Sequence, residues 1–179
     1  NPFYSICSLA TCKPIIRRTA SVNDWIIGTG TGERDRSGTL VYAMQVSEIL
    51  TYNEYWSSPQ FQNKKPILTG SKKQAFGDNI YCFDSGQWRQ ENSHHSYATD
   101  TIKRVQSDRV LLANEYVYFG GSGPKIPVKF KNYSGENICA KRGHKNRFSS
   151  NLVDEFIQWV KSLDEWGYVG EPLDWNRTP

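Results

Sequence analysis

Alternating hydrophobicity between residues 39 and 50 constrains the fold of this chain more than any other feature. Leu40, Tyr42, Met44 and Val46 recur at every second position. Because successive side chains of a β-strand point to opposite faces, this period of two predicts a strand with one buried face. A helix would need apolar residues three and four positions apart, so the segment is incompatible with an amphipathic helix.

Several other segments favour strands. Residues 24–29 (Asp-Trp-Ile-Ile-Gly-Thr) predict a strand, and the polar, glycine-containing stretch 30–38 connects it to the next as a β-hairpin. Residues 79–83 predict a short apolar strand, and 109–119 a long one that ends at two glycines. A short helix is expected before Pro14, since proline disfavours the helical conformation just ahead of it.

One segment, near residues 151–164, predicts an amphipathic helix. Ser150 or Asn151 is the expected N-cap, and Asp154 and Glu155 are expected in the first turn. Its apolar positions follow helical spacing and predict a buried face formed by Val153, Phe156, Ile157, Val160 and Leu163. The chain is therefore expected to be α+β: a small curved β-sheet or barrel with packed helices.

Length and composition favour one soluble domain over residues 1–179. No apolar run approaches the roughly 18 residues that a membrane helix needs, and no signal peptide is evident at the start. The four cysteines are irregularly spaced, which argues against a disulfide framework. We therefore expect a cytoplasmic protein that contacts no membrane. The oligomeric state is left open.

Two glycine and cysteine patterns suggest sites but have simpler explanations. Gly28, Gly30 and Gly32 resemble a phosphate-binding loop, but a strand follows them where such a loop needs a helix. Cys7 and Cys12 form one loose pair, whereas metal sites usually show paired, close spacings. A hairpin turn and buried thiols are the better interpretations, and we expect neither a metal nor a cofactor.

Aromatic residues make up 13% of the chain, more than a core of this size plausibly needs. A surplus of aromatic rings is what a base-stacking surface would use. The turn-like string around Asp78 adds short polar side chains that match the donor and acceptor edges of bases. The candidate base-binding residues are Tyr4, Trp25, Trp56, Asp78, Asn79, Tyr81, Trp88, His94 and Tyr97.

Catalysis has fewer candidates. His94 and His95 lie in a long polar stretch from residue 84 to 108, and either solvated imidazoles or base contacts explain them equally well. Asp78 and Cys12 are the other polar residues in suggestive strings. These four residues form no recognisable catalytic pair.

Positive charge is concentrated late in the chain. Between Lys125 and Arg147 there are seven basic residues and one acidic residue, Glu136, in a chain whose net charge is +4. Clustered lysine and arginine favour contact with phosphates. The candidate phosphate-binding residues are Lys13, Arg17, Lys125, Lys141, Arg142, Lys145 and Arg147.

Several strings together resemble a known family. They are the opening residues 1–17, Asp-Trp-Ile-Ile-Gly at 24–28, the Tyr55-Trp56 pair, Gly-Asp-Asn-Ile-Tyr at 77–81 and Tyr-Phe-Gly-Gly at 118–121. Over nearly the whole chain they resemble the second type of nucleotide modification associated domain. That resemblance implies a bacterial or phage protein encoded near genes that modify DNA bases. It also implies a role in anti-phage defence.

A weaker resemblance concerns the fold. The hairpin of residues 24–46 is similar to that of PUA-like domains, including the EVE, ASCH and YTH types. Those domains are small β-barrels that hold an RNA base or a flipped DNA base in an aromatic-lined pocket. The resemblance implies a PUA-like barrel here, although the first hairpin strand starts Asn23-Asp24 where those domains often have Gly-Asp.

Three functions remain open at this point. The first is a nucleic-acid-binding domain that recognises a modified or flipped base, most plausibly in DNA. The second is an enzyme, such as a glycosylase or base-tailoring transferase, acting on a modified base or nucleotide. The third is a protein-interaction module, which a mainly apolar exposed patch without a basic rim would favour.

Overall fold

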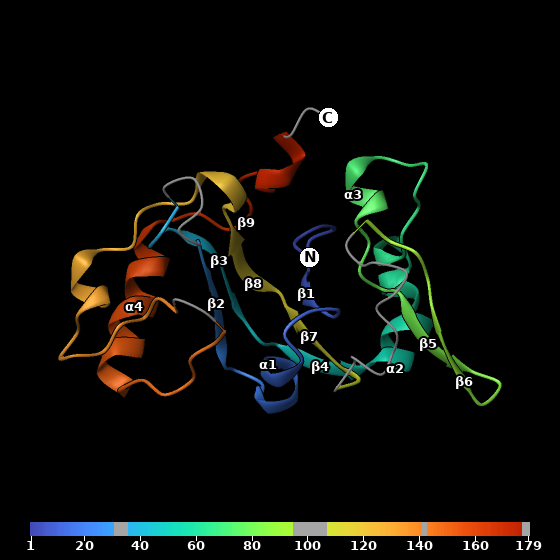
Figure 1. The fold of residues 1–179 in the computed structure, drawn as a ribbon, viewed down its shortest axis with the longest axis horizontal. Coiled ribbons are helices and arrows are strands. Elements are labelled where there is room, and N and C mark those ends of the chain that lie inside the picture. Colours follow the sequence, from blue (N-terminus) through green and yellow to red (C-terminus); the bar gives the residue numbers. More distant parts are fainter. Residues whose placement is uncertain (31–35, 95–106, 141–142, 177–179) are drawn as a thin grey trace. The chain divides into compact units, whose positions relative to one another are not determined.

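The computed structural model describes residues 1–30, 36–94, 107–140 and 143–176. Its helices and strands form an α+β fold, as the sequence predicts (Figure 1). The chain divides into two compact units, Asn1–Asp24 with Gln45–Glu115 and Trp25–Met44 with Tyr116–Pro179. We call them the first and second units and describe each by itself. A single domain over residues 1–179 stays a prediction.

A three-stranded sheet forms the centre of the first unit. Strand β7, Arg109–Ala113, lies between β1, Cys7–Leu9, and β4, Glu48–Thr51, and pairs with both in antiparallel orientation. Four of the five β7 residues are buried, as expected for the middle strand. Helix α1, Pro14–Thr19, joins the same unit and begins at the proline.

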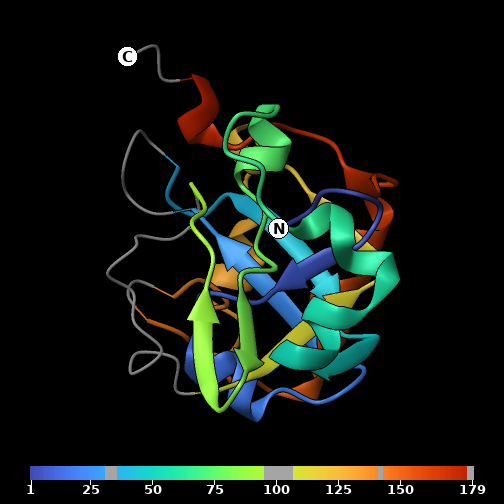
Figure 2. The same ribbon diagram turned by 90° about the vertical axis from the view of Figure 1, so that its right-hand side faces the viewer.

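Three helical segments follow β4 in the first unit. They are helix α2, Tyr52–Ser57, a 3₁₀ helix, Pro59–Lys64, and the short helix α3, Lys72–Ala75. A separate hairpin follows, made of β5, Tyr81–Asp84, and β6, Gln87–Gln90 (Figure 2). The buried core joins α2, the first 3₁₀ helix and β5 to strand β7 through Ala10, Tyr52, Tyr55, Phe61, Ile80, Tyr81, Val110 and Leu112.

The second unit is built on a four-stranded sheet. Its order is β2, Trp25–Thr29, then β3, Leu40–Gln45, β8, Glu115–Tyr118, and β9, Gly167–Tyr168. Strand β9 runs parallel to β8. The described part of the unit also contains short 3₁₀ helices at Gly120–Ser122, Val128–Lys131 and Leu173–Asn176.

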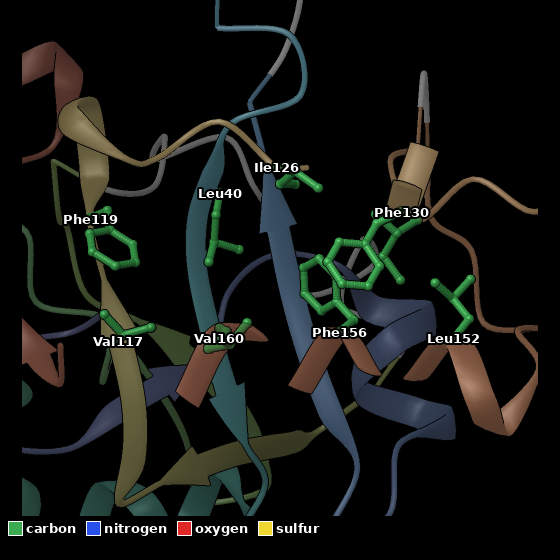
Figure 3. Packing of buried hydrophobic residues seen from close by; sticks show 10 residues of the cluster. Leu40, Val117, Phe119, Ile126, Phe130, Leu152, Phe156 and Val160 are labelled. Carbon is green, nitrogen blue, oxygen red and sulfur yellow. The ribbon is translucent and has the colours of Figure 1, made fainter. Parts of the chain in front are cut away.

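Helix α4, Ser150–Ser162, packs on this sheet (Figure 3). Phe156 is fully buried, as the sequence predicts, and its ring lies 5.1 Å from that of Phe130. The helix buries Leu152, Phe156 and Val160, while Val153, Ile157 and Leu163 are half-buried. The predicted face is therefore rotated, because Leu152, which the prediction left out, is buried, whereas Val153 is only half-buried.

The start of α4 also differs from the prediction. The N-cap is Ser149, rather than Ser150 or Asn151, and its side chain makes no capping bond. Instead, the Ser149 backbone N–H and hydroxyl both donate to the Glu136 carboxylate. An acid from a distant loop thus provides the negative charge that a helix N-terminus favours, and the first turn contains no acid of its own.

Two long predicted strands are each split. Segment 39–50 forms β3 and β4, and segment 109–119 forms β7 and β8. Strands β4 and β7 belong to the three-stranded sheet, whereas β3 and β8 belong to the four-stranded sheet. At the first break, Ser47 N–H donates to Leu112 O, which begins the β4–β7 pairing. The predicted helix before Pro14 is wrong, because β1 and a turn occupy that position and the helix follows the proline.

The described strands form three sheets of two to four strands and no closed barrel. Small sheets with packed helices are therefore confirmed, whereas a PUA-like barrel is not seen in the described ranges. No helix among the described residues has the length and apolar character needed to cross a bilayer.

Candidate functional site

Asp78 lies at the centre of a buried polar network in the first unit. Its two carboxylate oxygens accept hydrogen bonds from the Ser8 hydroxyl at 2.8 Å and from the Tyr55 hydroxyl at 3.0 Å. Burial, together with the charge of Asp78, raises the pKa of Tyr55 well above its ordinary value, so the phenol remains a donor. Ser8 comes from β1 and Tyr55 from α2, so the network links parts far apart in sequence.

Lys64 supplies the positive charge of this network and is 1% exposed. Its ammonium group donates to Ile6 O at 2.6 Å, to Asn1 O at 3.0 Å and to the Ser8 hydroxyl at 3.2 Å. Burial lowers the pKa of Lys64, and the negative charge of Asp78 partly offsets that effect. Ser8 therefore bridges the buried cation and the buried carboxylate.

Asn79 and Tyr81 are also buried. The Asn79 side-chain amide donates to Tyr55 O at 2.9 Å and to Phe61 O at 3.2 Å, which joins α2 to the following 3₁₀ helix. The Tyr81 ring packs 4.7 Å from that of Tyr52. In this arrangement the candidate edge-readers Asp78 and Asn79 face protein groups, and their base-binding role stays a prediction.

Other candidates are more accessible. His94 is exposed, and its ring meets that of Phe76 edge-on at 5.6 Å. Tyr4 is half-buried. The expectation of buried thiols holds for Cys7 and Cys82, whereas Cys139 is half-buried and Cys12 is exposed. His95 and Tyr97 lie outside the described residues.

Two candidate tryptophans carry lysine ammonium groups over their rings. Lys65 Nζ lies 3.6 Å from the ring centroid of Trp56, a close cation–π contact. In the second unit, Trp25 packs against the core, and Lys161 Nζ lies 5.9 Å from its ring. The contact at Trp56 covers one of its faces, so a stacking base would have to displace Lys65 or use the other face.

Trp88 differs from these because it lies in an exposed hairpin. It is 37% exposed and stands directly opposite Phe83, which is 46% exposed, with ring centroids 5.2 Å apart. The intervening Ser85 and Gly86 both have positive φ, as a two-residue type I′ turn requires. Asp84 and Gln87 flank the turn, so the two rings belong to the second residue pair from it and lie on one face of the hairpin.

The base of this aromatic pair is anchored on Tyr52. Trp88 meets the Tyr52 ring edge-on at 5.9 Å, and Tyr52 donates its hydroxyl to Ala10 O at 2.9 Å. On the hairpin, Arg89 pairs with Asp84 at 3.2 Å, both side chains being exposed. The hairpin thus presents aromatic surface held by a buried support, with little net charge.

The predicted phosphate-binding residues fall into separate groups. Arg17 is fully buried and donates to the backbone carbonyls of Cys12, Ser107 and Arg109 at 2.9, 2.7 and 2.6 Å. Lys141 and Arg142 lie outside the described residues. The exposed candidates are Lys13 in the first unit and Lys125, Lys145 and Arg147 in the second.

Sequence reasoning missed Phe83, Ser8, Tyr52 and Lys64. The Ser85-Gly86 dipeptide between Phe83 and Trp88 is a turn signal that would have revealed the hairpin. Nothing local marks Ser8 or Lys64, because their role depends on contacts made 70 and 56 residues away. Among the described residues, no group of three or more histidine, cysteine or acidic side chains is placed to hold a metal ion.

Comparison with known proteins gives one match. No curated protein and no solved structure was found to be similar to the chain. A family model described as nucleotide modification associated domain 2 matches residues 1–179, the whole sequence. The chain therefore belongs to the nucleotide modification associated domain 2 family.

Proposed function

We propose that this protein binds nucleic acid and that an unpaired or flipped base stacks on the exposed aromatic pair of the β5–β6 hairpin. The observation that carries the proposal is the exposure of Phe83 and Trp88, opposite each other beside a tight turn. Large aromatic side chains are normally buried. A pair held at the surface by contact with Tyr52 therefore favours a binding site for another molecule.

The chemistry of the hairpin favours base faces over phosphates. Its exposed cation, Arg89, is already neutralised by Asp84, so the hairpin offers rings rather than net positive charge. Stacking on an aromatic ring accepts any base, because every base has a π-face. Within a duplex those faces are hidden by neighbouring bases, so a base must be unpaired or flipped to reach the rings.

Membership in a family named for nucleotide modification indicates which ligands to test first. A single-stranded oligonucleotide that contains a modified pyrimidine, such as 5-hydroxymethylcytosine, is compared with its unmodified counterpart. Tighter binding of the modified strand is expected if the site recognises the modification. Mass spectrometry of the nucleosides after incubation then separates binding from catalysis, because an enzyme would release or alter the base.

We predict that Phe83→Ala and Trp88→Ala each weaken binding of a single-stranded oligonucleotide by about 5- to 150-fold, the equivalent of roughly 1–3 kcal/mol of lost stacking. Fluorescence anisotropy titration measures the effect. Trp166→Ala is the matched control, since Trp166 is an exposed tryptophan of the second unit. Equal affinities for all variants would remove the hairpin from the site. No binding by the wild-type protein would leave the aromatic pair as a contact for another protein.

Phosphate contact by the basic segment gives a separate prediction. Lys125, Lys145 and Arg147 are exposed, and reversing their charges together should weaken binding and flatten its salt dependence. Each lost phosphate contact is expected to reduce the slope of log K against log [salt] by about 0.7 for single strands. Titrations between low and moderate salt measure that slope. An unchanged slope would show that the segment does not contact phosphates.

A further inference from the structure

The loop before α3 carries a second exposed apolar feature, separate from the aromatic hairpin. Ile67 is 50% exposed and Leu68 is 46% exposed. The loop is ordered by hydrogen bonds of 3.0 Å from Ile67 N–H to Gln74 O and from Gly70 N–H to Ile67 O. The chain thus holds two adjacent aliphatic side chains in solvent on a fixed turn.

Two exposed lysines follow these two side chains in the sequence. From residue 55 to residue 77 the sequence has four lysines and no acidic residue. Lys64 is buried in the polar network, whereas Lys72 and Lys73 are exposed on α3, directly after the loop. An apolar tip with a basic flank is complementary to a polyanion that also has an apolar interior.

Base-paired nucleic acid has that composition. Its phosphates attract lysine, and the stacked bases accept an inserted aliphatic side chain, as in proteins that drive Ile or Leu between base steps. We propose that Ile67 and Leu68 form a wedge that enters a base step, while Lys72 and Lys73 contact the adjacent phosphates. This inference rests on the proposed nucleic-acid binding and adds a second contact to it.

The position of the loop supports two separate contacts. Helix α3 lies at the end of the first unit away from the turn of the β5–β6 hairpin (Figures 1 and 2). The wedge and the aromatic pair are therefore different surfaces of the same unit. The wedge would open a base stack, and the aromatic pair would receive an exposed base face.

A duplex that contains 2-aminopurine tests the wedge, because the fluorescence of this base rises when it is unstacked. Wild-type protein should raise the fluorescence on binding. The double variant Ile67→Ser, Leu68→Ser should remove most of that rise. Its affinity should change by no more than about threefold, because the free energy gained from the wedge contacts is similar to the free energy needed to unstack the bases. Lys72→Gln with Lys73→Gln should weaken binding about tenfold through lost phosphate contacts.

Val128→Ser is the matched control, since it removes an exposed aliphatic side chain in the second unit and should leave the rise unchanged. Thermal melts confirm that each variant folds. Binding without any fluorescence rise, or an equal rise with the double serine variant, would overturn the wedge alone. No binding of duplex or single strand would overturn the proposed function as well. If the double serine variant instead lost only its binding to vesicles of anionic lipid, the loop would be a membrane contact and the wedge would be wrong.

Discussion

Replacing Lys64 with methionine should lower the free energy of unfolding by about 3–5 kcal/mol, the usual effect of removing one partner from a buried set of charges. Methionine fills similar volume but donates no hydrogen bond. Ile6 O and the Ser8 hydroxyl would lose a donor, and Asp78 would keep a buried negative charge without its nearby cation. Urea denaturation followed by circular dichroism measures the loss.

Asp78→Asn and the double variant identify the cause. If the two charges stabilise each other, the loss of unfolding free energy in the double variant should be smaller than the sum of the two single losses. The expected difference is at least about 0.5 kcal/mol, which is the lower end of the usual coupling energy between residues in contact. Lys72→Met, at an exposed lysine, is the control and should change stability by less than about 0.5 kcal/mol. Strict additivity would show that the charges of Lys64 and Asp78 do not stabilise each other and that the loss comes from the other hydrogen bonds and the packing of Lys64.

Phe156→Ala should destabilise the protein by about 3–5 kcal/mol. Phe156 is fully buried and packs against Phe130, with ring centroids 5.1 Å apart (Figure 3). Its ring centroid also lies 5.1 Å from that of Trp159. Truncation removes the central contact between α4 and the sheet of the second unit and leaves a cavity. Equilibrium unfolding in urea measures the change.

Gln158→Ala is the control for this substitution because Gln158 is exposed on the same helix. Its expected effect is within about 0.5 kcal/mol, so the pair separates packing from helix propensity. A loss below about 1 kcal/mol for Phe156→Ala would mean that the helix does not pack as described.

Local patterns predicted the regular elements well where burial has a period. The alternation at residues 39–50 and the three-four spacing near 151–164 both correspond to observed elements. The breaks at Val46–Ser47 and at Asn114 were not predicted, because no proline or glycine marks either point at which the chain passes from one sheet to another. Which sheet a strand joins depends on partners that are distant in sequence.

The candidate site shows the same limit. Asp78 and Asn79 were singled out as candidate base-binding residues, but the sequence could not show that Ser8, Tyr55 and Phe61 would supply their hydrogen-bond partners. Arg17 likewise binds carbonyls about 90 residues away. The local sequence around a polar residue does not indicate whether its side chain faces solvent or the interior. Only the fold distinguishes these two cases.

The exposed hairpin was half predicted. Trp88 was a candidate base-binding residue, whereas Phe83 was assigned to a short apolar strand and the partner strand was placed in the long polar stretch 84–108. The hairpin's second strand, Gln87–Gln90, is short and polar apart from Trp88, so hydrophobic periodicity does not reveal it. The turn residues Ser85 and Gly86 were the available signal.

Photocrosslinking tests the central claim most directly. A single-stranded oligonucleotide with one 5-iodouracil base is bound to the wild-type protein, irradiated in the near ultraviolet and mapped by peptide mass spectrometry. Stacking on the aromatic pair predicts that the crosslinked peptide contains Phe83 or Trp88 and that Trp166→Ala leaves the crosslink unchanged. Crosslinks confined to peptides outside residues 81–90, at an oligonucleotide concentration that saturates binding, would contradict the proposed site.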